Sequence, residues 1–190
     1  MNRTALMFFV CGVLLLALTG CLEETTVELP QPRELTRDAV GHYCGMIVED
    51  HPGPKAQVFV AGRDTPIWFS SVRDAFAFTK LPGEVKNIRA IYVNDMGKAT
   101  NWNAPETGTW IDARKAHFVL NSDRRGGMGA KETVPFSNSE AAAGFIAKHG
   151  GNTVDFSEVP ADYVLGDDNP QSGADAHEGH HGLKKRDGES

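Results

Sequence analysis

The chain has 190 residues, of which 41% are hydrophobic, 23% charged and 8% aromatic. This composition is typical of one ordinary globular domain or two small ones, and it excludes a fibrous or wholly disordered protein. There are 19 basic and 25 acidic residues, which gives a net charge of −6. An acidic chain without a stripe of Lys and Arg argues against a nucleic-acid-binding function. Three cysteines are too few for a disulfide scaffold.

The N-terminal segment, residues 1–20, has the features of a secretory signal. Arg3 precedes Ala5–Leu18, an apolar stretch of 14 residues that is too short for a comfortable membrane span. The sequence Leu18-Thr19-Gly20-Cys21 is similar to the lipobox of bacterial lipoproteins, whose cysteine becomes the lipidated first residue. Leu22 in place of Asp resembles lipoproteins sorted to the outer membrane, so we expect a periplasmic protein anchored there. The alternative is an ordinary signal peptide with an accidental cysteine.

Removal of the signal would leave a single free thiol. Cys11 is discarded with the signal and Cys21 carries the lipid, so Cys44 has no cysteine with which to form an intramolecular disulfide. Exported compartments are oxidising, and a free thiol there is a liability unless it is buried, bound to a metal or catalytic.

The mature chain divides into four segments. Residues 21–35 are polar with two prolines and are typical of a tether. Residues 166–190 have almost nothing to bury, which indicates a disordered tail. Between them we expect two small units, residues 36–104 and residues 105–165, each too small to build a large core alone.

A faint internal repeat supports the two units. Every match has an offset of 67 residues: Gly62 with Gly129, Phe69-Ser70-Ser71 with Phe136-Ser137-Asn138, and Phe78 with Phe145. The predicted elements, in chain order, are strands 57–61 and 66–69, helix 71–80, strand 88–93, strands 116–120 and 133–136, helix 137–149 and strand 152–156. This predicts an α+β fold with a strand–strand–helix–strand unit used twice. The alternative is a coincidence between two amphipathic segments.

The two predicted helices share a start signal. Ser71 with Asp74, and Ser137 with Glu140, have the spacing of a capping box. We therefore expect a serine cap at each helix.

The segment His42-Tyr43-Cys44-Gly45-Met46 is the most informative for function. In an extended chain, His42, Cys44 and Met46 would project to one face. A thiolate with a thioether is a donor set that favours Cu(I), whereas zinc prefers several cysteines or histidines and calcium prefers oxygen. The alternatives are a buried structural cysteine with a core methionine, and for His42 a structural histidine rather than a ligand.

Met128 is a candidate third ligand. It lies among glycines in Gly126-Gly127-Met128-Gly129, with no local apolar neighbours, between two strands of the second unit. The alternative is a loop methionine that docks into a gap. In the tail, His177, His180 and His181 could hold a divalent metal weakly as an accessory site, or could simply be solvated.

Taken together, these residues resemble the NosL family of copper lipoproteins, which accompany nitrous oxide reductase. The resemblance covers about residues 36–165. It rests on the lipobox at Cys21, His42-Tyr43-Cys44-Gly45-Met46, Gly53-Pro54 with Gln57, Trp68-Phe69-Ser70-Ser71 with Phe76, and Met128-Gly129 followed by Pro135-Phe136.

The resemblance implies two similar α+β units related to the organomercury lyase fold. It also implies a Cu(I) chaperone, not an enzyme, that supplies metal for the copper centres of nitrous oxide reductase. Cys44, Met46 and Met128 match the family's ligand positions, although this chain has Gly127 where the family often has proline before the methionine. The implied partners are an ABC-type transporter with its periplasmic subunit, and the reductase.

Two other functions stay open at this point. Cys44 could serve a thiol-dependent enzyme, such as a lyase or an oxidoreductase, although such chemistry generally needs a second cysteine or a positioned base. A lipid-anchored adaptor with a structural cysteine is the third hypothesis.

Overall fold

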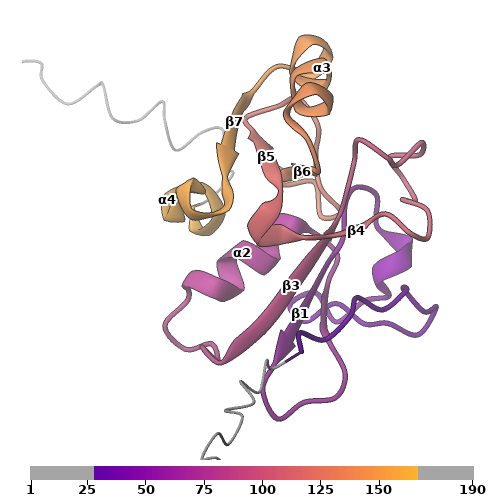
Figure 1. Cartoon of the computed structure of the whole chain (residues 1–190), viewed down its shortest axis with the longest axis vertical. Coiled ribbons are helices and arrows are strands. Elements are labelled where there is room, and N and C mark those ends of the chain that lie inside the picture. The colour runs from indigo at the N-terminus through magenta and orange to yellow at the C-terminus, as the bar shows by residue number, and fades with distance from the viewer. Residues whose placement is uncertain (1–27, 167–190) are drawn as a thin grey trace, which may run out of the picture.

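The computed structural model describes residues 28–166, shown in Figure 1. The expected signal, the lipidation site at Cys21 and the histidines of the tail lie outside the described residues. The helices and strands are β1 (Ala56–Val60), β2 (Ile67–Phe69), α2 (Val72–Lys80), β3 (Ile88–Asn94), β4 (Trp110–Asp112), β5 (His117–Leu120), β6 (Val134–Phe136), α3 (Ser139–His149), β7 (Asn152–Asp155) and α4 (Ala161–Leu165). Three short 3-10 turns, η2 (Val48–Asp50), η3 (Ala113–Lys115) and η4 (Phe156–Glu158), complete this part of the chain. Within residues 28–166, no helix combines the length and the apolar character needed to cross a bilayer.

The strands form two antiparallel sheets with the same local order. The first sheet runs β2-β1-β3-β4 and the second runs β6-β5-β7, so each unit places its first strand between its second and third. Gly62 and Gly129, which the repeat aligns, both have positive φ values of 80° and 77°. Phe69 and Phe136 both end the second strand of their unit. The predicted α+β fold, with a strand–strand–helix–strand order in each half, is confirmed.

Two features differ from the expected boundaries. Strand β4 lies beyond residue 104 but pairs with β3, so it completes the first sheet. The end of the expected tether is bound to the same sheet, because Arg33 exchanges two hydrogen bonds of 2.8 Å with the buried amide of Gln57. The Tyr92 hydroxyl also donates to the carbonyl of Pro30 at 2.6 Å. A buried amide must be satisfied, and the extended proline-containing segment supplies its partners.

The elements pack in layers that bring the two units into one core. On β5, Phe118 and Leu120 face the main core with α2 and the first sheet, whereas Val119 faces the opposite way, toward α3. This alternation is the two-residue period of a strand. The second sheet therefore lies between α3 and the first unit, an arrangement visible in Figure 1.

The helix starts differ from the predicted capping boxes. Ser71 precedes α2 but its side chain makes no cap hydrogen bond. The α3 helix is capped by Asn138, whose side chain accepts from the Ala141 N–H at 2.8 Å, one residue later than predicted. Asn and Ser are comparable N-cap residues, so sequence spacing alone does not select between neighbours.

Gly144 offers a direct test of the second helix. It lies in the exposed middle of α3, and a Cβ added there would meet no atom within 4 Å. Glycine in a helix interior costs about 1 kcal/mol relative to alanine. We expect Gly144→Ala to raise the free energy of unfolding by about 0.5–1 kcal/mol, measured by urea denaturation of the metal-free protein. No change, or a loss, would contradict a regular helix at this position.

Candidate metal centre

Cys44 and Met46 lie in a tight turn that joins two bridged residues, Val40 and Ile47. The Gly45 N–H donates to the Gly41 carbonyl at 2.9 Å, and Gly45 has a φ of 65°. This is a single helical turn closed by a glycine in the left-handed region, as at many helix ends. The expected extended segment is therefore wrong, because the chain reverses direction between residues 41 and 46.

The turn is fixed to the first sheet next to its edge strand. The His42 N–H donates to the Trp68 carbonyl at 2.8 Å, and Gly41 forms an isolated bridge with Trp68. This places the Sγ of the half-buried Cys44 3.6 Å from the Oγ of Ser70 and 4.0 Å from the Met46 carbonyl oxygen. A Cβ on residue 41 would lie 2.6 Å from that sulfur, so the glycine makes room for the thiol.

The Met128 loop approaches the same place from the second unit. Gly127 packs so closely on the first unit that an added Cβ would lie 2.9 Å from the Ser70 carbonyl oxygen and 2.7 Å from the His51 Cβ. Ser70 is therefore in contact with both Cys44 and the loop that carries Met128. The fold brings together the loops of all three predicted sulfur ligands around this one buried serine.

Both thioether side chains reach the surface. Met46 is 43% exposed and Met128 is 54% exposed. Solvent exposure of this size is unusual for an unbranched apolar side chain that serves only to fill a core. Among residues 28–166, no three His, Cys, Asp or Glu side chains gather into a group that could hold a metal ion. The donor set of one thiol and two thioethers fits a soft cation such as Cu(I), and not zinc or calcium.

The histidines have partners that the sequence did not reveal. His42 Nε2 lies 3.5 Å from a carboxylate oxygen of Glu84, and its ring packs edge-on against Phe69 and Phe78. His51 Nδ1 lies 3.2 Å from the Gly127 carbonyl, next to Met128. The remaining two body histidines form pairs with aspartates, His117 with Asp155 and His149 with Asp123. The role of His42 as a fourth ligand stays a prediction.

Glu84 also holds the aromatic residue of the turn. The Tyr43 hydroxyl donates to Glu84 at 2.9 Å. Burial, together with this hydrogen bond and the negative charge of Glu84, raises the pKa of Tyr43 far above its usual range. The phenol therefore stays neutral at physiological pH, and its hydrogen bond to Glu84 ties the turn to the segment that follows α2.

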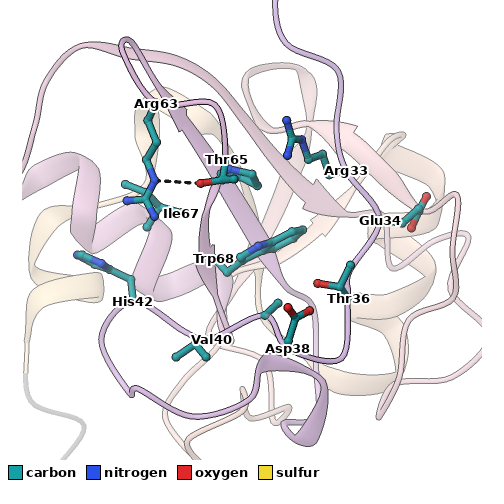
Figure 2. Close-up of a pocket in the computed structure, with 12 residues that line it drawn as sticks. Arg33, Glu34, Thr36, Asp38, Val40, His42, Arg63, Thr65, Ile67 and Trp68 are labelled. Carbon is teal, nitrogen blue, oxygen red and sulfur yellow. Dashed lines mark hydrogen bonds between the residues drawn. The ribbon is translucent and has the colours of Figure 1, made fainter.

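A separate open cavity of about 390 Å³ lies beside the turn (Figure 2). Figure 2 shows the Trp68 indole in the middle of its lining, between His42 on one side and Glu34 with Thr36 on the other. None of the three predicted sulfur ligands lines this cavity. The candidate metal centre therefore lies outside this cavity, on two adjoining loops.

Fold and site together define a class: an α+β protein of two similar units that presents a thiol and two thioethers on adjoining surface loops. The NosL family model matches residues 32–164 of the chain. The chain therefore belongs to the NosL family.

Individual relatives agree with this assignment. The copper-binding lipoprotein NosL of Achromobacter cycloclastes is 43% identical over 164 residues, which is 86% of this chain and 84% of the relative. The copper-binding lipoprotein NosL of Stutzerimonas stutzeri is 32% identical over 148 residues, 77% of this chain and 76% of the relative. The crystal structure of the copper chaperone NosL from Shewanella denitrificans has a TM-score of 0.64 and 32% identity, and the match covers 68% of this chain and 95% of that one.

Proposed function

We propose that this chain is a lipid-anchored periplasmic metallochaperone that binds Cu(I) through Cys44, Met46 and Met128. It delivers the ion for maturation of the copper centres of nitrous oxide reductase. The observation that carries the proposal is the meeting of the Cys44 turn and the Met128 loop on Ser70, with both thioethers exposed. The named relatives, two copper-binding lipoproteins and one copper chaperone, support it.

The geometry suits transfer of an ion rather than permanent storage. The thiol of Cys44 loses its proton when a metal binds and supplies the one charged ligand. The exposed thioethers are neutral, weaker donors, and they lie where a partner protein can reach them. An incoming ligand can bond to Cu(I) before a methionine leaves, so the ion passes without being released to water.

The anchor and partners follow from the same proposal. Lipid at Cys21, with attachment to the outer membrane, confines the chaperone to a surface and so raises the effective concentration for a partner at a membrane. We propose that the recipients are an ABC-type transporter with its periplasmic subunit, and the reductase either directly or through them. The tail histidines, His177, His180 and His181, are proposed as a weak accessory site.

The contacts of Cys44 favour this function over a thiol-dependent enzyme. A catalytic thiol needs a base or a second cysteine that activates it. Within residues 28–166, the hydrogen-bond partners of the Cys44 sulfur are the Ser70 hydroxyl and the Met46 carbonyl, and neither is a base. The nearby His42 is paired with Glu84. Metal binding requires only that the thiol be reachable.

Copper titration with X-ray absorption spectroscopy tests the proposal. We expect the reduced protein to bind one Cu(I) in its folded body with a sulfur-dominated shell. Met46→Ala and Met128→Ala should each remove one sulfur scatterer. Val40→Ala, which alters a side chain of similar exposure near the turn, should leave the shell unchanged. A shell of nitrogen and oxygen atoms, or an unchanged sulfur count in both methionine variants, would contradict the ligand assignment.

A further inference from the structure

Glu132 is a fully buried carboxyl that joins the two units. It precedes β6 in the second unit, and only 1% of it is exposed. Its Oε1 accepts hydrogen bonds from the Arg73 N–H at 3.0 Å, the Thr133 N–H at 2.8 Å and the Ser71 hydroxyl at 3.3 Å. The carboxyl therefore caps α2 from a distance of 61 residues along the chain, in place of the local cap that Ser71 does not make.

The second oxygen of this carboxyl faces the Met128 loop. Glu132 Oε2 is buried and has no hydrogen-bond partner within the described residues. It lies against the Cα of Gly126, so closely that a Cβ on residue 126 would overlap it. Gly126 forms two backbone hydrogen bonds that close the short loop carrying Met128. Its N–H donates to the Ala130 carbonyl, and its carbonyl accepts from the Gly129 N–H, both at 2.9 Å.

The carboxyl thus touches both halves of the candidate site. On one side it accepts a hydrogen bond from Ser71. The preceding residue, Ser70, contacts the Cys44 sulfur. On the other side it supports Gly126, two residues from Met128.

The surrounding charges show that the arrangement is costly. Burial raises the pKa of Glu132 to about 7, partly offset by its three hydrogen bonds, and the charge of Asp74 raises it further. The opposite charge of Lys55, whose own pKa is lowered to about 8 by burial, interacts favourably with the Glu132 carboxylate. Arg73 contributes its backbone N–H to the carboxyl.

The hydrogen bonds of Lys55 lead to the Met128 loop. Lys55 donates at 2.5 Å to the carbonyls of His51 and Gly53, and His51 contacts Gly127.

A helix cap alone does not explain this carboxyl. A serine at the same helix start can supply a cap without burying a charge, and a buried carboxylate with one unpaired oxygen is destabilising. Sites that break a local rule without a gain in stability are commonly functional. This loss of stability has an explanation if the carboxyl fixes the position of the loop that carries the candidate ligand Met128.

We propose that Glu132 is a positioning residue of the copper site, which holds the Gly126–Met128 loop against Ser70 and Ser71 so that the Met128 sulfur reaches an ion on Cys44. This inference rests on the proposed Cu(I) function. Groups that orient metal ligands from behind typically contribute about 10- to 100-fold to metal affinity. The contribution of Glu132 acts through Met128, because the carboxyl packs directly against the loop of that ligand and reaches the Cys44 sulfur only by way of Ser71 and Ser70.

A double-mutant cycle tests the coupling in the full-length reduced protein. Glu132→Gln keeps the shape of the side chain but puts an amide against Gly126. We expect it to weaken Cu(I) binding by about 10-fold or more, measured by competition with a colorimetric Cu(I) chelator. In the Met128→Ala background the same change should have no effect, and Glu132→Gln should lose one sulfur scatterer by X-ray absorption. An equal loss of affinity in both backgrounds would show a purely structural role and overturn the inference.

A second variant reaches the same contact from the other side. Gly126→Ala inserts a methyl group between the loop and the carboxyl, and we expect the same loss that disappears in the Met128→Ala background. Gly83→Ala, where a Cβ would meet open space, is the matched control. Wild-type affinity in Glu132→Gln or in Gly126→Ala, with Met128→Ala still weakened, would refute the role of Glu132 alone. Failure of the wild-type protein to bind Cu(I) would refute the proposed function itself.

Discussion

Replacing Cys44 with serine is expected to abolish tight Cu(I) binding. Serine keeps the size of the side chain and its contacts with Ser70 and the Met46 carbonyl, but it replaces a soft, ionisable thiol with a hard alcohol that does not deprotonate near neutral pH. The two remaining thioethers carry no charge and cannot hold the ion alone. We expect the loss of Cu(I) affinity to exceed the 10- to 100-fold effect that is typical of a residue that only orients a metal ligand.

The measurement is a chelator competition under strictly reducing conditions with cuprous ion. Val40→Ala is the control, because it changes an exposed side chain at the start of the turn and leaves the thiol in place. We expect that control to keep one tightly bound ion. Retention of wild-type stoichiometry and affinity by Cys44→Ser would remove the basis of the copper assignment. Selective loss of turnover of a thiol-dependent substrate would instead favour the enzyme alternative.

The strands and helices that the two units share could be predicted, because the residues of each element indicate its type locally. Strand β3 is rich in apolar residues that favour strands, with Ile91 and Val93 buried, and glycines follow α3 at the predicted end. The matched glycines at 62 and 129 both have a positive φ, which favours glycine, so the sequence indicates these turns directly. Elements with weaker local signals were missed, such as the three-residue β4 and the five-residue α4.

The candidate site was predictable in composition but not in geometry. The identities of Cys44 and Met46 suggested soft-metal chemistry, but the turn that holds them depends on Trp68, which bridges Gly41 across the fold. The contact of Gly127 with Ser70 joins residues 57 positions apart and has no local sequence signal. Glu132 gave no signal either, because a carboxylate in a loop is ordinarily solvated.

The missed contacts share one physical origin, the interface between the two units. The Met128 loop, the Glu132 carboxyl and the N-terminus of α2 meet where the second unit packs on the first. The repeated sequence pattern predicts the strands and helices within each unit. It does not predict the contacts between the units, because the junction occurs once and has no counterpart within either unit. The proposed metal site therefore depends on docking of the units, which would let copper binding and unit packing stabilise each other.

The pH dependence of stability gives an independent view of the buried carboxyl at this junction. Glu132 has a pKa of about 7 in the folded chain against its usual 4.5, mainly because of burial. The folded state therefore holds this proton more tightly than the unfolded state, and stability falls as pH rises from about 4.5 to about 7. Relative to Glu132→Gln, which cannot ionise, we expect the metal-free wild type to lose about 2 kcal/mol of unfolding free energy between pH 5 and pH 7.5.

Urea denaturation of both proteins at the two pH values measures this difference. The window ends below pH 8, near which the buried Lys55 changes its own charge and begins to add stability with rising pH. Glu140→Gln, at an exposed carboxyl in the first turn of α3, is the control and should track the wild type at both values. A wild-type difference from Glu132→Gln that is the same at pH 5 and pH 7.5 would mean that the carboxyl does not gain its proton on folding. In that case the cap on α2, and the support of Gly126 with it, would be made by a carboxylate that solvent or a counter-charge stabilises.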